Sequence, residues 1–387
     1  MNNILNFDDY LLESNSIYTL KPDVKTKLLE LDEKYHKLTE KFRTKYVATT
    51  CSNLREEFDK FMSAKNMGQK YYPQLEIENS NVDNKLIENF EKLKDEFKKI
   101  KDDCYIVKFY LEKIEGMLEG LELRKQLETG DYTTPDKNPV DKSLYEEALE
   151  CIKNNPYKKP DFKNDRNIES DKFLEEIEDA LDELGYNFEV QINDNMLPRM
   201  NVKMGRVNVN RKAKFSEDDI DGLIAHEIKG HVGRRYYGKE TGLWLFAYGL
   251  QSSSTYDEGL AVWNSLNLVK HKKDNVMFNI AMKTCVSYLM FEMDFCDLFD
   301  WVKKKAPTMT DYTTFKIIVR PRRRNKDCEI KSGEPMTTYF KGYNMVKDMD
   351  DKMRDDILHY NIGPNQIFEL ENIKEFFKVN KFKKIQQ

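Results

Sequence analysis

No apolar run in the sequence is long enough to cross a lipid bilayer. The longest apolar windows, such as residues 242–250, are far shorter than the roughly 20 residues that a membrane-spanning helix needs. The first residues, Met-Asn-Asn-Ile-Leu-Asn-Phe-Asp-Asp, lack a basic start followed by an apolar stretch, so no secretory signal is predicted. We therefore expect a cytoplasmic protein without a membrane partner.

Cysteine is sparse, and its spacing excludes two kinds of site. None of the six cysteines forms a CxxC pair of the kind that zinc ribbons and dithiol redox sites use. They are Cys51, Cys104, Cys151, Cys285, Cys296 and Cys328. Scattered cysteines of this kind are typical of reduced thiols in the cytosol.

Charge of neither sign dominates the chain, because the formal net charge is only −5. Overall acidity opposes attraction to phosphate and no nucleic-acid motif is present, so no nucleic-acid partner is expected. Hydrophobic residues make up 40% of the chain and charged residues 34%, as in a globular protein with a well-solvated surface. Basic runs occur late, at residues 303–305, 320–324 and 378–384. Such runs are either solvated surface or a cationic groove for an acidic ligand.

Two amphipathic helical regions open the chain. Apolar residues recur at spacings of three and four over residues 21–66 and again over 84–127, between lysines and glutamates. Stretches with prolines and polar residues at 129–141 and 154–165 break this pattern. A domain boundary near residue 150 is therefore predicted.

The hydrophobic period changes after a predicted helix at residues 170–184. Residues 188–192 alternate apolar with polar side chains, and residues 202–209 do the same, which is typical of strands. Gly205 interrupts the second run, so a hairpin turn or a bulge is predicted there. Helices are predicted to dominate again from residue 216 to about 305.

A helix start is encoded just before a segment that carries two histidines. Ser216 is placed as an N-cap with Asp219 three residues later, and Phe215 and Ile220 are spaced as a hydrophobic staple. The helix then runs into Leu-Ile-Ala-His-Glu-Ile-Lys-Gly-His, which carries two of the five histidines of the chain. These histidines are therefore predicted to lie at the end of an apolar, buried segment.

The two histidines, His226 and His231, flank Glu227 in an HExxxH spacing. Buried imidazoles need partners, and a zinc ion satisfies both while the carboxylate serves as a base. On an ideal α-helix, however, a step of five residues turns the side chain by about 140°, against about 40° for a step of four. A π-bulge or an exit from the helix at Gly230 would absorb the extra residue. Structural histidines are the alternative interpretation.

Glu258 is the predicted third ligand. It lies in Tyr-Asp-Glu-Gly-Leu-Ala, which follows a loop rich in glycine and serine and opens another helical pattern. A glutamate from a second helix is the usual completion of a His-His-Glu peptidase site. The alternative is a capping box formed by Thr255 and Glu258, which would make Glu258 a helix-start residue only.

The segment from residue 215 to 266 resembles the tyrosine carboxypeptidase family. That family includes the microtubule-associated enzymes that remove the C-terminal tyrosine of α-tubulin, together with bacterial relatives named for a QEGLA motif. The likeness is strong over about 194–268 and looser on either side. The motifs that carry it are His226-Glu227-Ile228-Lys229-Gly230-His231, Arg234, Gly238, Gly249-Leu250 and Asp257-Glu258-Gly259-Leu260-Ala261.

The resemblance implies a zinc peptidase site. It implies that His226, His231 and Glu258 bind Zn²⁺. It also implies that Glu227 is the general base, a catalytic residue that takes the proton of the attacking water.

Pattern and resemblance together predict an α+β fold that is predominantly helical. An N-terminal helical region is expected over residues 1–150. A zincin-like metallopeptidase domain is expected over residues 151–387, with a small sheet beside the HExxxH helix.

A carboxypeptidase also needs a fixed cation for the terminal carboxylate of its substrate, and arginine offers a bidentate fork. Residues 320–324, Arg-Pro-Arg-Arg-Arg, resemble the arginine pair of the family, although Arg324 stands where a glycine is usual. Arg320 and Arg323 are therefore ranked first as substrate-binding residues, and an ordinary surface or structural role is the alternative for each candidate. The full set of candidates is Arg234, Arg320, Arg322 and Arg323.

A second motif of the family is partly kept. Residues 336–342, Met-Thr-Thr-Tyr-Phe-Lys-Gly, keep the tyrosine, basic and glycine positions but lack the Lys-Asp pair that commonly precedes them. Tyr339 is predicted to donate a hydrogen bond to the oxyanion or the substrate. Packing is the alternative in a chain with 21 tyrosines. These departures concern substrate recognition and not the metal.

The predicted function is a zinc-dependent carboxypeptidase that removes a C-terminal aromatic residue, with tyrosine expected from the family. Its partner would be a peptide or protein C-terminal tail, and α-tubulin or microtubules are the candidates that the resemblance implies. A zinc endo- or aminopeptidase is one alternative. A non-catalytic binding protein with a degenerate site is another, but the intact Glu227 argues against it.

Overall fold

The computed structural model describes most of the chain, and 69% of it is helical. This confirms a predominantly helical fold with small sheets. Within the described part, no helix combines the length and apolar character that a membrane crossing requires. The described residues are 21–45, 50–78, 82–100, 105–129, 137–159, 167–194, 199–203, 206–250, 252–268, 273–322 and 326–370.

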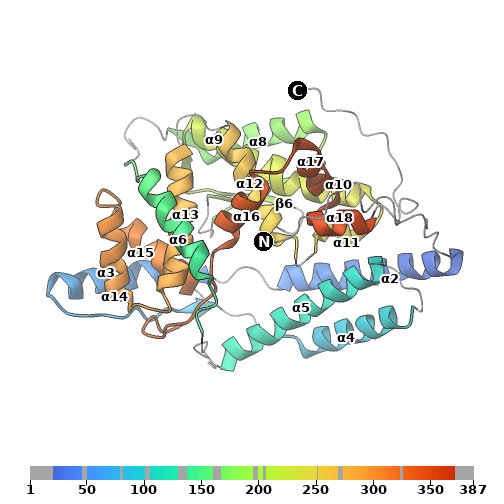
Figure 1. Cartoon of the computed structure of the whole chain (residues 1–387), viewed down its shortest axis with the longest axis horizontal. Helices are drawn as coiled ribbons and strands as arrows, with labels where there is room; N and C mark the ends of the chain where they lie inside the picture. The colour runs from blue at the N-terminus through green and yellow to red at the C-terminus, as the bar shows by residue number, and fades with distance from the viewer. Residues whose placement is uncertain are drawn as a thin grey trace.

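The N-terminal helices form two separate groups in the molecule. α2, α4 and α5 pack side by side, whereas α3 and α6 lie at the other end, against α13, α14 and α15 (Figure 1). The amphipathic spacing explains the packing: α4, for example, buries Leu86, Phe90, Leu93 and Phe97 along one face. The helices are α2 (Pro22–Lys45), α3 (Leu54–Asn66), α4 (Asn84–Lys98), α5 (Tyr105–Thr129) and α6 (Lys142–Asn154), and a short antiparallel pair, β1 (Thr50–Cys51) and β2 (Ile77–Glu78), accompanies them.

The largest described sheet has three strands in the order β4-β6-β5. β6 (Arg206–Asn210) runs parallel to β4 (Glu189–Asn193) and antiparallel to β5 (Met200–Lys203). Lys203 pairs with Arg206, so the predicted hairpin is confirmed, while residues 204 and 205 themselves lie outside the described part.

Helix α8 (Ser170–Leu184) has the predicted bounds and packs on this sheet. Gly185 follows it at φ 69°, the left-handed conformation that a glycine adopts without steric cost. The buried face of α8 joins Val207 and Val209 of β6 in one hydrophobic cluster. The strands β3 (Ile168–Glu169) and β7 (Lys214–Phe215) pair antiparallel beside it.

The rest of the chain is helical, as expected for residues 216–305, and α12 lies at its centre beside α16 (Figure 1). These elements are α9 (Glu217–Leu223), η1 (Ile224–Val232), α10 (Gly233–Glu240), α11 (Trp244–Tyr248), α12 (Ser254–Leu268), α13 (Lys273–Leu289), α14 (Phe295–Lys305), α15 (Asp311–Arg322), α16 (Thr338–Val346), α17 (Asp351–Tyr360) and α18 (Pro364–Leu370).

Three hydrophobic clusters form the described core, and two of them contain residues from both sides of residue 150. One joins α2, α4 and α5 to α11, α12 and the last helices. The other joins α3 and α6 to α13, α14 and α15. The division into residues 1–150 and 151–387 therefore stays a prediction from sequence.

Helix α12 packs very closely against α16 on one side and against η1 on another. A Cβ placed on Gly259 would lie 2.3 Å from the backbone of Gly342 in α16, and one on Gly342 would lie 2.0 Å from the carbonyl oxygen of Thr255. On the η1 side, a Cβ on Gly230 would lie 3.0 Å from that of Ala261. The α12–α16 contact therefore requires glycine on both helices.

We expect Gly342→Ala to separate α12 from α16 and to lower the free energy of unfolding by about 1–3 kcal/mol or more, as overpacking does. Gly120→Ala in α5 is the matched control, since nothing lies within 4 Å of its added methyl group. The control should instead stabilise the protein by about 0.5–1 kcal/mol, because alanine favours the helix. Denaturant titration measures both values, and equal effects of the two substitutions would contradict the helix contact.

Candidate metal centre

The helix that leads to the histidines starts where the sequence predicts. The backbone N–H of Asp219 donates to Ser216 Oγ at 3.2 Å, and the N–H of Ser216 donates to Asp219 Oδ2 at 3.2 Å. Phe215 and Ile220 are both buried in the cluster that contains the sheet. The capping box is therefore confirmed, and α9 continues into η1 without a break.

The HExxxH segment is a π-helix over Ile224–Val232. In a π-helix the hydrogen bonds run from i to i+5, so side chains five residues apart return to one face. The ring centroids of His226 and His231 are 5.1 Å apart as a result. Of the two predicted ways to absorb the extra residue, the chain uses the π-helix, and Gly230 lies inside it.

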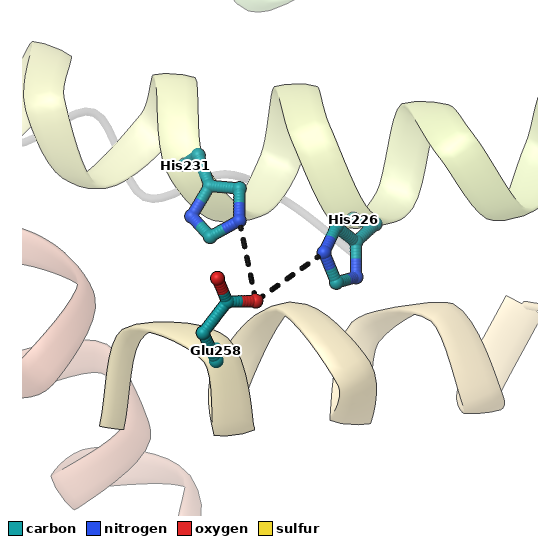
Figure 2. Close-up of side chains that lie close together, drawn as sticks. All are labelled: His226, His231 and Glu258. Carbon is teal, nitrogen blue, oxygen red and sulfur yellow. Dashed lines mark ion pairs between the residues drawn. The ribbon is translucent and has the colours of Figure 1, made fainter. Parts of the chain in front are cut away.

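Glu258 completes a cluster with the two histidines (Figure 2). Its Oε2 atom lies 3.7 Å from His226 Nε2 and 3.8 Å from His231 Nε2. Helix α12 begins at Ser254, so Thr255 is inside the helix and is not its N-cap. The capping-box interpretation of Glu258 is therefore wrong, because the carboxylate points to the histidines.

The cluster fits a zinc ion. Ligand atoms about 2.0–2.1 Å from a tetrahedral zinc lie about 3.3–3.5 Å apart, slightly closer than these atoms are. Glu258 Oε2 is buried and has no hydrogen-bond partner among the described residues, which costs free energy unless a cation or a proton compensates it. Two imidazole nitrogens and one carboxylate oxygen are also the donor set of many catalytic zinc sites. Zinc itself stays a prediction.

A carboxylate that the sequence analysis missed supports His231. Asp257 Oδ1 lies 3.1 Å from His231 Nδ1 and 3.3 Å from Nη1 of Arg234, which is 1% exposed. Such a contact fixes the ring and its tautomer, so that Nε2 faces Glu258. Arg234 is thus in place to hold Asp257, and its predicted binding of substrate stays a prediction.

Burial sets the proton affinities in the cluster. It lowers the pKa of His226 to about 3, and His231 adds to this effect. Burial also opposes protonation of His231, but Asp257 and the other carboxylates outweigh it and raise the pKa to about 10. Burial raises the pKa of Glu227 to about 7, while His231 opposes the shift. A carboxylate with this pKa can both accept and return a proton near neutral pH.

A lysine without any motif lies near Glu258. Lys283 on α13 has its Nζ atom 4.2 Å from the centroid of the Tyr339 ring. Burial, with the cation of Arg320, lowers the pKa of Lys283 to about 7, and Glu258 opposes this shift. Because α13 carries no sequence signature, sequence reasoning had no signal for Lys283.

The arginine candidates have different surroundings. Arg320 is exposed and interacts electrostatically with Glu258. Arg322 is 0% exposed, donates from Nη2 to the carbonyl oxygen of Met290 and packs over Phe295, so it is part of the core and offers no fork to a substrate. Arg323 lies outside the described residues. Substrate binding by Arg320 and hydrogen bonding by Tyr339 stay predictions.

A helical fold with a half-buried His-His-Glu cluster beside a glutamate is the arrangement that a metal-dependent hydrolase would use. Comparison with known proteins gives the family: the model of the microtubule-associated tyrosine carboxypeptidase family matches residues 59–346, and the chain belongs to this family. The resemblance drawn from the histidine and Asp-Glu-Gly motifs is thereby confirmed. The family indicates a carboxypeptidase.

Other comparisons add little. No curated protein matches the chain. One solved structure that matches is a protein described as a lipoprotein from Colwellia psychrerythraea, with a TM-score of 0.44 and 10% identity. The match covers 75% of this chain and 66% of the other. A likeness this low carries no argument about function.

The ligand assignment predicts a graded loss of zinc. Glu258→Gln replaces an anionic ligand by a neutral one, so we expect zinc affinity to fall more than about 100-fold, whereas Asp257→Asn should cost about 10–100-fold, as loss of a supporting carboxylate does. Competition with a fluorescent chelator measures both. Glu217→Gln, exposed at the start of α9, is the control and should change nothing. Unchanged affinity in Glu258→Gln would remove Glu258 from the ligand set.

Proposed function

We propose that this protein is a zinc-dependent carboxypeptidase that removes a C-terminal aromatic residue, tyrosine in the first place, from a peptide or protein tail. The supporting observation is the cluster of His226, His231 and Glu258, with the half-buried Glu227 in the same π-helix as the two histidines. Membership of the carboxypeptidase family supports the type of reaction.

The residues divide the chemistry between holding the metal and moving a proton. His226, His231 and Glu258 would hold Zn²⁺, which when bound supplies a Lewis acid for the substrate carbonyl and for water. Glu227 takes the proton of the attacking water on its carboxylate and returns it to the nitrogen of the leaving amino acid. Its raised pKa suits both transfers at neutral pH.

The partner that the family name supports is an acidic C-terminal tail such as that of α-tubulin, in free tubulin or in microtubules. The exposed Arg320 adds positive charge near Glu258, where the terminal residue would be held. A zincin-like arrangement, with the β4-β6-β5 sheet beside η1, is consistent with the contact between β5 and η1. A cytoplasmic location belongs to the same proposal.

Glu227→Gln should leave zinc binding intact and reduce kcat by about 10³-fold or more, because the amide keeps the shape of the side chain and cannot accept the proton. Metal analysis and turnover of a peptide ending in tyrosine measure the two effects. Retention of zinc together with full activity would assign the base to another residue.

Amidation of the substrate separates the carboxypeptidase from other peptidases. We expect acidic peptides that end in Tyr or Phe to lose that one residue, and their C-terminal amides to resist, because an exopeptidase recognises the free carboxylate. Mass spectrometry of matched acid and amide peptides measures this. Equal cleavage of both, or cleavage inside the peptide, would favour an endopeptidase.

A further inference from the structure

The place of Lys283 follows from two contacts between helices. Its ammonium group lies over the ring of Tyr339, which is on α16. Tyr339 and Gly342 are three residues apart and so lie on the same side of this helix. Gly342 touches Gly259, the neighbour of Glu258. Lys283 therefore lies by the end of α12 that carries the predicted metal ligand.

A second cation accompanies Lys283. Arg320, exposed near the end of α15, interacts electrostatically with Lys283, and both cations act on Glu258. Lys283 also acts on His226. The two cations thus come from different helices, and both act on Glu258 of the histidine–glutamate cluster.

Neither cation has an ion-pair partner within the described part of the chain. A half-buried ammonium without a carboxylate costs free energy, and a neighbouring guanidinium adds repulsion. The ring of Tyr339 offsets part of this cost through a cation–π contact. Two such cations beside a candidate active site attract an anion such as a carboxylate.

We infer that Lys283 and Arg320 bind the free C-terminal carboxylate of the substrate, and that the ring of Tyr339 holds Lys283 in position. This inference rests on the proposed carboxypeptidase function. It names the side chains that would restrict cleavage to the C-terminal residue of a substrate. Neighbouring residues in a chain are about 3.8 Å apart, so the terminal carboxylate lies close to the scissile carbonyl and needs a cation close to the metal ligands. An amide or an internal peptide bond carries no charge for this pair.

The test measures binding without turnover. In the zinc-loaded protein carrying Glu227→Gln, calorimetry gives the Kd of a short acidic peptide ending in tyrosine, once as the free acid and once as the amide. We expect the acid to bind at least about 100-fold more tightly. Lys283→Met should reduce this ratio at least about 10-fold, and Arg320→Gln should also reduce it. Lys283→Arg should restore most of it.

A matched lysine provides the control. Lys316 Nζ lies 4.8 Å from the centroid of the Tyr312 ring on α15, the same kind of contact one helical turn before Arg320. Lys316→Met should leave the acid-to-amide ratio unchanged. Tyr339→Phe keeps the ring and should keep the ratio, whereas Tyr339→Leu should reduce it.

Each outcome separates the two proposals. An acid-to-amide ratio near one in the parent protein would overturn the carboxypeptidase function itself. A large ratio that survives Lys283→Met would overturn only the role of Lys283. Folding does not confuse the result, because methionine removes a desolvated charge and the melting temperature should stay the same or rise.

Discussion

The candidate site depends on how closely three helices approach one another. Gly259 and Gly342 bring α12 against α16, and Gly230 meets Ala261 where η1 crosses α12. The ligand atoms of His226, His231 and Glu258 lie within 4.8 Å of one another. Larger side chains at these positions would move the helices apart and would separate the ligand atoms. These small residues therefore serve the candidate metal site indirectly, because they set the distance between the helices that carry His226, His231 and Glu258.

This close packing places charges where water solvates them only in part, and the polar contacts around the cluster offset the cost in free energy. Asp257 would be expensive to bury alone, but His231 and Arg234 hold its pKa well below the usual range although burial opposes this. Buried ion pairs add little net stability compared with apolar packing. The pairing of Arg234, Asp257 and His231 is therefore better explained by the orientation of the imidazole than by stability, since a ring that rotated would turn Nε2 away from Glu258.

The sequence predicted features that depend on neighbouring residues and missed those that depend on tertiary packing. The capping box at Ser216, the helix at Ser170–Leu184 and the hairpin after β5 follow local rules. The five-residue step between the histidines predicted either a π-bulge or an exit from the helix at Gly230, and the structure has the π-helix. Asp257 adjoins a motif, yet its role needs His231 and Arg234 to be its neighbours in space. Arg322 was a candidate for binding the terminal carboxylate because it lies in a basic run, but the packing of α15 turns it into the core. No sequence motif marks Lys283 as a functional residue.

Lys283 and Arg320, the two cations proposed to bind the substrate carboxylate, also bear on the departures of this chain from its family. Arg324 replaces the usual glycine, and the Lys-Asp pair before Tyr339 is absent, so recognition based on those motifs alone would be weakened. Lys283 comes from α13, a separate helix, and reaches the cluster through the ring of Tyr339, which the chain keeps. A carboxylate needs only opposite charge at the right distance, and cations from two helices meet that requirement independently of the residues between Arg320 and Tyr339. Exopeptidase character can therefore persist while the side-chain preference of the site changes, because charge selects the chain end and the surrounding residues select the amino acid.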